Sequence, residues 1–183
     1  MLIGLVGPIA SGKGVVGEYL VKKKFHRYTL SDEVREEAMK LGIVIRRKEL
    51  QDLGNEMRQT HGEGYWAKII VEKTEIGKDY VIDGIRNPGE VAVFRALKDF
   101  VLVGVDAPIE VRLQRITQRN KDSDPRTLEE IRLIERRDRG IGEQKHGQQV
   151  QICYDAADFF IYNNGSVEDV EREVEKILRI VMN

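Results

Sequence analysis

The chain carries Gly7-Pro8-Ile9-Ala10-Ser11-Gly12-Lys13-Gly14 directly after the apolar run Leu2-Ile3-Gly4-Leu5-Val6. This order predicts a strand, a glycine-rich loop and a helix, with the glycines and Lys13 at the spacing of a phosphate-binding loop. The glycines let successive backbone N–H groups point at one phosphate, and the following helix adds the positive end of its dipole. The residues expected to contact a phosphate-bearing ligand here are Gly7, Ala10, Ser11, Gly12, Lys13, Gly14 and Val15.

The position after Lys13 departs from the usual pattern. A phosphate-binding loop generally continues with Ser or Thr, whose hydroxyl binds Mg²⁺, whereas here Gly14 and Val15 follow. Ser11 precedes the lysine and is no obvious replacement. Any Mg²⁺ must therefore be held by the nucleotide, by water and by a carboxylate elsewhere, or be held weakly.

Bulk properties limit the classes of protein to be considered. A length of 183 residues suits one domain with one core, and a net charge of −1 argues against a general nucleic-acid binder. Cys153 is the single cysteine, so no intrachain disulfide can form and the cytoplasm is the expected compartment. No segment approaches the length of a membrane span. We expect small nucleotides as partners, no nucleic acid or membrane, and a monomer or homodimer.

Short apolar runs alternate with amphipathic helical stretches along the chain. The runs that predict strands are Leu2–Val6, His26–Leu30, Tyr80–Ile82, Phe100–Val105 and Phe159–Tyr162. This alternation predicts an α/β fold with three layers, in which a five-stranded parallel sheet has helices on both faces.

Several helix ends are also predictable from local sequence. Side chains that accept a hydrogen bond from the first turn predict helix starts, and glycine predicts stops. The predicted starts are at Ser31, Asn87, Thr127 and Ser166, and the predicted stops are at Gly77 and Gly140.

Polar residues follow the predicted strands, and ligands of open parallel sheets bind beyond the carboxyl ends of the strands. Asp83 comes directly after Tyr80–Ile82, where a carboxylate can reach Mg²⁺ or its water, although a helix-capping aspartate has the same spacing. Arg35 and Arg86 follow the second and third strands. Their planar guanidinium groups suit a phosphate, so we assign both to the phosphate of a second, acceptor substrate. For Arg35 the alternative is that it is an ordinary surface arginine without a ligand.

Several segments resemble the adenylate-kinase-like nucleotide kinases. Residues 29–35, with Asp32, resemble the segment that opens the monophosphate-binding helix of these enzymes. Asp83-Gly84-Ile85-Arg86 resembles their Asp-Gly-Phe-Pro-Arg, one residue shorter. Arg115 and Arg119 are similar in placement to the arginines that lead into the lid, and Arg136 and Arg137 to those on its far side. The resemblance spans nearly the whole chain.

Within that superfamily the chain looks most like deoxynucleoside monophosphate kinases and dephospho-CoA-kinase-like proteins. Residues 50–58 resemble the Leu-Gln-x-x-Gly-x-x-x-Arg element of the first group, which implies an acceptor contact for Arg58. The alternative without a ligand is that residues 50–66 form a packed helix pair, with Trp66 in the core. Residues 147–165 resemble the end of the second group, which implies that Asn163, Asn164 and Gly165 border the ATP base.

The resemblance implies a P-loop kinase domain over residues 1–183, with a monophosphate-binding insertion at about 31–76 and a lid at about 119–139. Its polar segment 120–126 is the best candidate for a mobile part. The implied reaction moves the γ-phosphoryl group of ATP to a nucleoside or deoxynucleoside monophosphate, with ATP and Mg²⁺ as cofactors.

Each candidate residue then has an expected role. The catalytic candidates are Lys13, Asp83, Arg119, Arg136 and Arg137, and Asp83 is also the metal candidate. Besides the loop, the ATP-binding candidates are Arg115, Arg119, Asn164 and Gly165, and the acceptor-binding candidates are Asp32, Arg35, Arg58 and Arg86. Two alternatives stay open: a dephospho-CoA-kinase-like hydroxyl kinase with Asp32 as its base, and a non-catalytic nucleotide sensor that lacks the loop hydroxyl.

Overall fold

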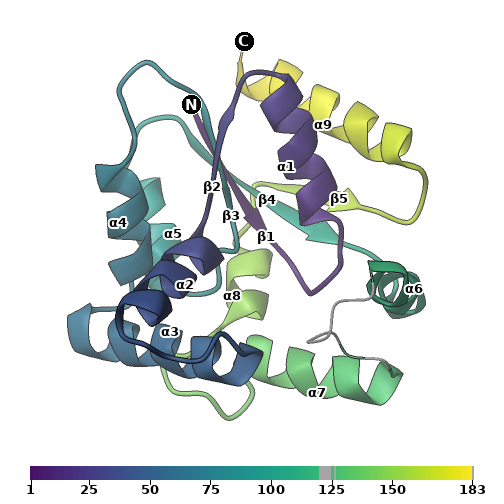
Figure 1. Ribbon diagram of the computed structural model, residues 1–183. Coiled ribbons are helices and arrows are strands. Elements are labelled where there is room, and N and C mark those ends of the chain that lie inside the picture. Colours follow the sequence, from purple (N-terminus) through teal and green to yellow (C-terminus); the bar gives the residue numbers. More distant parts are fainter. Residues whose placement is uncertain (120–124, 126, 183) are drawn as a thin grey trace.

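Five parallel strands, in the order β2-β3-β1-β4-β5, form the centre of the computed structural model (Figure 1). The structure describes residues 1–119, 125 and 127–182, and of Arg119 only the backbone. The strands are β1 (Leu2–Val6), β2 (His26–Thr29), β3 (Tyr80–Asp83), β4 (Phe100–Asp106) and β5 (Phe159–Tyr162). The described helices are α1 (Lys13–Lys22), α2 (Leu30–Lys40), α3 (Arg47–His61), α4 (Tyr65–Glu72), α5 (Pro88–Arg95), α6 (Ile109–Arg119), α7 (Leu128–Asp138), α8 (Val150–Asp155) and α9 (Val167–Val181).

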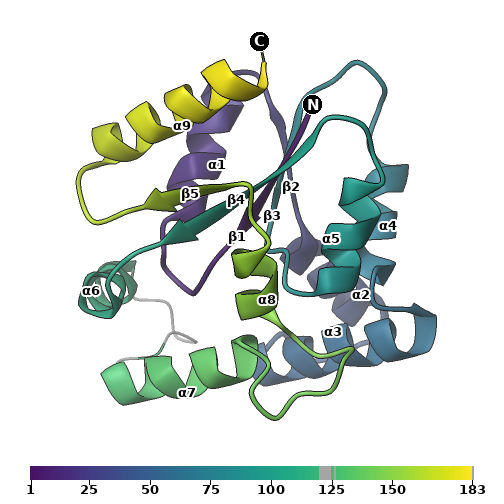
Figure 2. The same ribbon diagram turned by 180° about the vertical axis from the view of Figure 1, so that it is seen from behind.

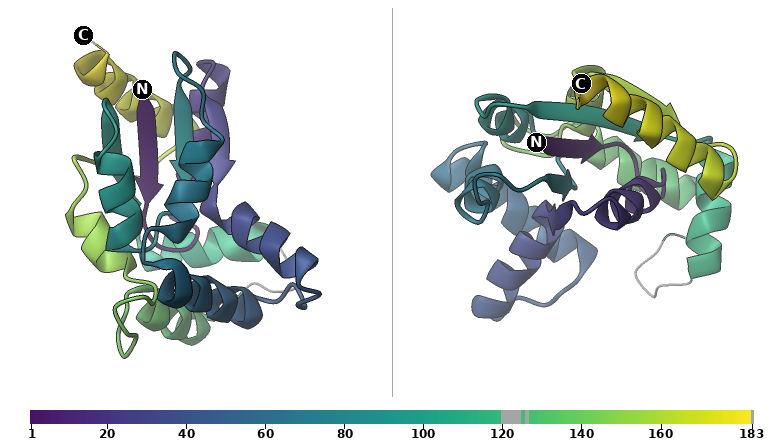
Figure 3. Two further views of the ribbon diagram at one scale, coloured as in Figure 1. Left: turned by 90° about the vertical axis from the view of Figure 1, so that its left-hand side faces the viewer. Right: turned by 90° about the horizontal axis from the view of Figure 1, so that it is seen from above.

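The predicted sheet is confirmed, and each predicted strand ends within one residue of the observed one. Along β1, Leu2 and Val6 join a hydrophobic cluster with α2, α4, α5 and α8, whereas Ile3 and Leu5 join a second cluster with α1 and α9. Seen from above, α1 and α9 cover one face of the sheet and α4 and α5 the other (Figure 3). Both faces are thus buried, which is why the strands read as continuous apolar runs.

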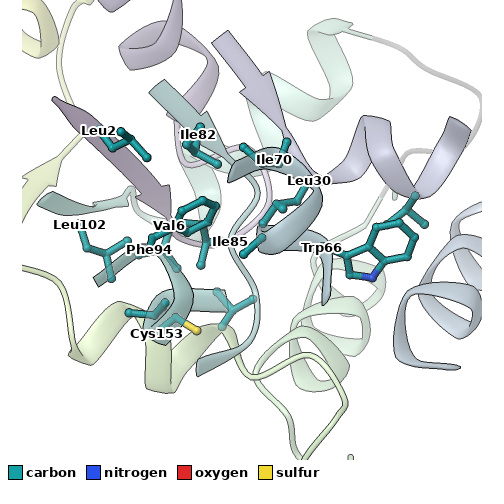
Figure 4. Close-up of a cluster of buried hydrophobic side chains, with 14 of the residues drawn as sticks. Leu2, Val6, Leu30, Trp66, Ile70, Ile82, Ile85, Phe94, Leu102 and Cys153 are labelled. Carbon is teal, nitrogen blue, oxygen red and sulfur yellow. The ribbon is translucent and has the colours of Figure 1, made fainter. Parts of the chain in front are cut away.

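Trp66 belongs to the first cluster (Figure 4). Its ring is 1 % exposed, and its indole N–H donates to the Gly54 carbonyl at 3.2 Å. The indole therefore joins α3 to α4 in the core, as the packed-helix interpretation of this segment expects.

Three predicted helix starts are confirmed, because Asn87, Thr127 and Ser166 each cap a helix through a reciprocal capping box. The start at Ser31 was wrong. Thr29 is the cap instead, and its Oγ1 accepts from the Asp32 N–H at 3.1 Å. Thr29 is both the last residue of β2 and the N-cap of α2, so the helix begins two residues earlier than expected.

One of the two predicted helix stops was also wrong. Gly140, with a φ of +87°, follows the end of α7 as expected. Gly77 does not end a helix, because α4 stops at Glu72 and Gly77 lies in the following turn with a φ of +85°. Its positive φ explains the glycine at this position.

The strands direct their carboxyl ends to one edge of the sheet, and α3 and α7 lie beyond that edge (Figures 1 and 2). Residues 30–72 form α2, α3 and α4 between β2 and β3, in the place predicted for the acceptor-binding insertion. Helix α6 ends at the start of the predicted lid, about 119–139, and α7 lies within it, but most of its segment 120–126 is outside the described residues. No described helix is long and apolar enough to cross a membrane.

Candidate active site

The loop after β1 can be built only with glycine at two positions. Gly7 and Gly12 have φ values of +148° and +107°. A Cβ on Gly7 would lie 1.9 Å from the Val105 carbonyl oxygen, and one on Gly12 would lie 1.8 Å from Asn163 Nδ2. The loop therefore fits closely between the ends of β4 and β5, and both glycines are required for positive φ and for close approach.

Lys13 begins α1 and folds back over the loop. Its Nζ donates to the carbonyl oxygens of Gly7 at 2.7 Å and Pro8 at 2.8 Å. Burial lowers the pKa of Lys13 from 10.5 to about 8, and the nearby Asp83 carboxylate opposes part of that effect. The ammonium group thus lies on the loop, where an incoming phosphate could replace its carbonyl partners.

Arg115 and Asn163 donate hydrogen bonds to the backbone of the phosphate-binding loop. Arg115 donates to the Ser11 carbonyl at 3.3 Å and to Asn163 Oδ1 at 2.9 Å, and Asn163 Nδ2 donates to the same carbonyl at 3.0 Å. By contrast, Asn164 and Gly165 line a separate cavity of about 380 Å³ between β5 and α9. Of the residues after β5, it is therefore Asn163 that joins the phosphate-binding loop.

A cavity of about 900 Å³ opens at the carboxyl edge of the sheet between the loop, α2 and α3. It brings together most of the residues predicted from the sequence. The predicted residues that line it are Gly7, Ala10, Ser11, Gly12, Lys13, Gly14, Val15, Asp32, Arg35, Arg58, Asp83, Arg86 and Arg115.

Among the described arginines that line this cavity, carboxylates neutralise most. The pairs are Arg27 with Asp83, Arg35 with Asp32, Arg47 with Asp138, and Arg58 with Glu90. Only Arg86 and Arg115 have no carboxylate partner among the described residues. Arg86 Nη2 lies 3.5 Å from Ser31 Oγ, and Nη1 lies 3.1 Å from the Gln148 amide oxygen once that amide is turned to satisfy its neighbours. Arg86 thus brings a positive charge to the cavity that an anion can neutralise.

Asp83 is the candidate for a metal. Its Oδ2 accepts from Arg27 at 2.9 Å, and its Oδ1 is buried with no hydrogen-bond partner. The described residues contain no cluster of three or more His, Cys, Asp or Glu side chains able to hold a metal. Because Mg²⁺ commonly takes one or two carboxylates together with phosphate and water oxygens, Asp83 fits a nucleotide-borne Mg²⁺.

Arg58 reaches the cavity wall, but its charge is already neutralised. Its Nε donates to Glu90 Oε1 at 2.8 Å, and its Nη1 donates to Asn55 Oδ1 at 3.2 Å. Arg58 is 4 % exposed and Glu90 is fully buried. In this arrangement Arg58 links α3 to α5, and its predicted contact with the acceptor stays a prediction.

Arg136 and Arg137, the arginines predicted for the far side of the lid, are not among the described residues that line the cavity. Arg136 is exposed, and Arg137 donates to Asp52 at 2.6 Å and to Glu143 at 2.9 Å. The side chain of Arg119 lies outside the described residues. The catalytic roles of Arg119, Arg136 and Arg137 stay predictions.

Three functional candidates were missed from the sequence. Arg27 pairs with Asp83, and Arg112 is buried, donates to the Ala107 carbonyl at 2.8 Å and pairs with Glu135. Gln148 borders Arg86. No motif marks Arg27 or Arg112, and the resemblance of residues 147–165 implied no role for Gln148. The spacing of Arg112 three residues before Arg115 could have shown that both lie on one face of α6.

We predict that nucleotide affinity falls above pH 8. A bound phosphate needs the ammonium form of Lys13, whereas the free protein loses that proton near its pKa of about 8. The dissociation constant should be flat below pH 8 and should rise about ten-fold per pH unit above it, because binding then requires proton uptake. Phosphate groups have their own second pKa near about 6 and do not titrate in this range.

Calorimetric titration of ATP between pH 7 and 9.5, in two buffers of different ionisation enthalpy, measures both the affinity and the proton uptake. An affinity that stays constant to pH 9.5 without proton uptake would show that Lys13 does not titrate near the nucleotide.

Comparison with known proteins agrees with this geometry. The family model described as an AAA domain matches residues 3–139. Among solved structures, TT1252 from Thermus thermophilus has a TM-score of 0.61 at 20 % identity, over 98 % of this chain and 97 % of that one. Shikimate kinase from Aquifex aeolicus has a TM-score of 0.55 at 19 % identity, over 100 % and 96 %. The fold and loop define a P-loop NTPase with the fold of the P-loop kinases.

Sequence relatives give the family. The UPF0200 protein TK1334 of Thermococcus kodakarensis is 31 % identical over 185 residues, which cover 97 % of this chain and 96 % of the relative. The UPF0200/UPF0201 protein of Archaeoglobus fulgidus is also 31 % identical, and this chain spans about half of it, 54 %. The chain belongs to the AAA domain family and to the UPF0200 proteins.

Proposed function

We propose that the chain is an ATP-dependent kinase that transfers the γ-phosphoryl group to the phosphate of a nucleoside or deoxynucleoside monophosphate. One observation carries the proposal: Lys13 and Arg86 line the same cavity, and neither has a carboxylate partner at ion-pair distance among the described residues. Two such cations in one cavity suit two phosphate groups.

The two halves of the cavity suit the two substrates. The loop between β1 and α1 offers backbone N–H groups and Lys13 to the triphosphate of ATP. The opposite half is formed by α2, α3 and the segment after β3, where Arg35 and Arg86 suit the acceptor's phosphate. Glu90 Oε2 accepts from the backbone N–H of Arg86 at 2.8 Å, and this contact fixes the start of that segment.

Phosphoryl transfer in this cavity needs no nucleophile from the protein. An oxygen of the acceptor's phosphate attacks the γ-phosphorus in line, the bond to the β,γ-bridging oxygen breaks, and that oxygen leaves with ADP. The acceptor oxygen is already ionised, so no base is required. Lys13 stabilises the negative charge that spreads over the transferring group. Mg²⁺ carried by ATP would be held through Asp83 and would shield the β- and γ-phosphates.

A hydroxyl kinase is the second candidate. Asp32 lines the acceptor half of the cavity, where a base for a hydroxyl group would lie. Its side chain is 60 % exposed and pairs with Arg35 at 2.6 Å. The Arg35 guanidinium therefore already engages a carboxylate oxygen to which a hydroxyl group would have to donate, so we favour the phosphate acceptor.

Replacing Arg86 with lysine tests the acceptor half. The variant keeps the charge but loses the two-pronged guanidinium geometry, so acceptor affinity should fall by about 1.5–3 kcal/mol while ATP affinity stays nearly normal. Separate calorimetric titrations of ATP and of each nucleoside monophosphate measure the two effects. Arg172→Lys, at an exposed position of α9, is the matched control and should change neither. If the variant lost ATP affinity alone, the assignment of Arg86 to the acceptor half of the cavity would be wrong.

A further inference from the structure

We propose that Arg27 is a built-in cation beside the nucleotide phosphates, which positions Asp83 and makes nucleotide binding nearly independent of a metal ion. The inference rests on the proposed nucleotide site and adds a residue that no motif indicated. In other P-loop proteins the corresponding charge is supplied by Mg²⁺ between a loop hydroxyl and a carboxylate.

Arg27 lies where it can do this. It belongs to β2, lines the large cavity, and donates through Nη2 to Asp83 Oδ2 at 2.9 Å. Asp83 in turn has the strongest charge–charge effect on the pKa of Lys13. The three charged groups therefore form a row from the edge strand to the phosphate-binding loop.

Helix α1 leaves space for the guanidinium group. A Cβ on Gly17 would lie 3.1 Å from Arg27 Cζ, so the guanidinium rests directly against this glycine. Gly14, three residues earlier, lies on the same face of the helix. A Cβ at Gly14 would have nothing within 4 Å. There is therefore room at position 14 for the Ser or Thr that is usual in these loops, but the chain has glycine. The chain thus lacks the hydroxyl ligand, and the Arg27 side chain from β2 packs against the same face of α1.

The ion pair between Arg27 and Asp83 leaves some of its polar atoms without hydrogen-bond partners. Arg27 Nε and Asp83 Oδ1 are both buried without a hydrogen-bond partner. A buried polar atom without a partner is destabilising, and such atoms are commonly found where a ligand completes the site. Strands β2 and β3 already pair over four residues, from His26 with Tyr80 to Thr29 with Asp83, and do not need the ion pair to hold them together.

Electrostatics gives the expected behaviour. Without a neighbouring cation, the Asp83 carboxylate would repel the phosphates of ATP. Arg27 neutralises it, so ATP can bind before or without a metal. Removing Arg27 takes away the guanidinium that pairs with this carboxylate, and a metal ion then becomes necessary to offset the remaining repulsion.

The test compares ATP dissociation constants measured by calorimetry in Mg²⁺ and in excess EDTA. For the wild-type chain the two values should agree within about three-fold. In Arg27→Gln the value in EDTA should rise at least about ten-fold, and Mg²⁺ should restore most of the loss. Arg27→Lys should stay near the wild type because it keeps the charge.

Two further variants make the result specific. Arg95→Gln removes an arginine that pairs with Asp158 at the same 2.9 Å but away from the cavity, and it should leave both constants unchanged. Asp83→Asn tests the inference even if Arg27→Gln does not fold, because it leaves the Arg27 guanidinium without its carboxylate partner and ATP affinity in EDTA should rise above the wild-type value.

The inference is overturned if the wild type binds ATP only with Mg²⁺, if Arg27→Gln weakens binding equally in both buffers, or if Asp83→Asn does not bind ATP in EDTA more tightly than the wild type. No ATP binding by the wild type in either buffer would overturn the proposed function as well. Binding that behaves as described, without phosphoryl transfer to any acceptor, would overturn the proposed function alone.

Discussion

Replacing Lys13 with alanine should lower kcat at least about a hundred-fold, a loss near 3 kcal/mol of transition-state stabilisation. The ammonium group lies on the loop, within 2.8 Å of the Gly7 and Pro8 carbonyl oxygens, and can follow the charge that moves onto the γ-phosphoryl group. Because that charge spreads most in the transition state, the loss should be larger in kcat than in ATP affinity. Steady-state kinetics at saturating ATP measures it.

Lys22→Ala is the matched control. Lys22 lies in the last turn of the same helix and is 69 % exposed, so its loss should leave kcat unchanged. Thermal unfolding of both variants separates a catalytic effect from a folding defect. A normal kcat in folded Lys13→Ala would mean that the loop after β1 is not the site of phosphoryl transfer.

Replacing Glu90 with alanine should lower the free energy of unfolding by about 3–5 kcal/mol, since it leaves a buried guanidinium without its partner. Glu90 is fully buried, and it accepts from Arg58 Nε and from the backbone N–H groups of Arg86 and Asn87. All three donors would lose their acceptor at once. Urea denaturation followed by circular dichroism measures the change.

Two variants control this prediction. Glu75→Ala breaks an exposed pair with Lys78 and should leave the stability nearly unchanged. The double variant Arg58→Met, Glu90→Leu removes both charges and should regain much of the loss. If Glu90→Ala were as stable as the wild type, Arg58 would be free for the acceptor and the structural role given to it here would fail.

The sheet could be predicted because its strands are continuous apolar runs, and the runs from Leu2 and Tyr80 each end at a polar, functional residue or loop. The phosphate-binding loop could be predicted because glycine is the only residue that fits Gly7 and Gly12, so the spacing itself carries the geometry. The predictions at Ser31 and Gly77 were wrong because the position of a helix end depends on where the neighbouring strand or helix ends. Other residues able to cap or end the helix lie within a few positions.

The partners of charged side chains could not be predicted. Nothing in the sequence indicates that Arg58 pairs with Glu90, Arg137 with Asp52, or Arg27 with Asp83, because each pair joins segments between 32 and 85 residues apart. These pairings decide which arginines keep a charge available to a ligand. Most of the residues predicted from the sequence therefore line one cavity, but the sequence could not separate Arg86 from the neutralised arginines.

Transfer of a phosphoryl group from ATP to a nucleoside monophosphate is the activity that we propose for this cavity. The most direct measurement incubates the wild-type chain with ATP labelled at the γ-phosphate and a panel of ribo- and deoxyribonucleoside monophosphates, dephospho-CoA and shikimate. We predict labelled nucleoside diphosphate from at least one monophosphate, none from the hydroxyl acceptors, and loss of the product with Lys13→Ala. Label transferred only to a hydroxyl acceptor, or to none while ATP still binds, would contradict the account.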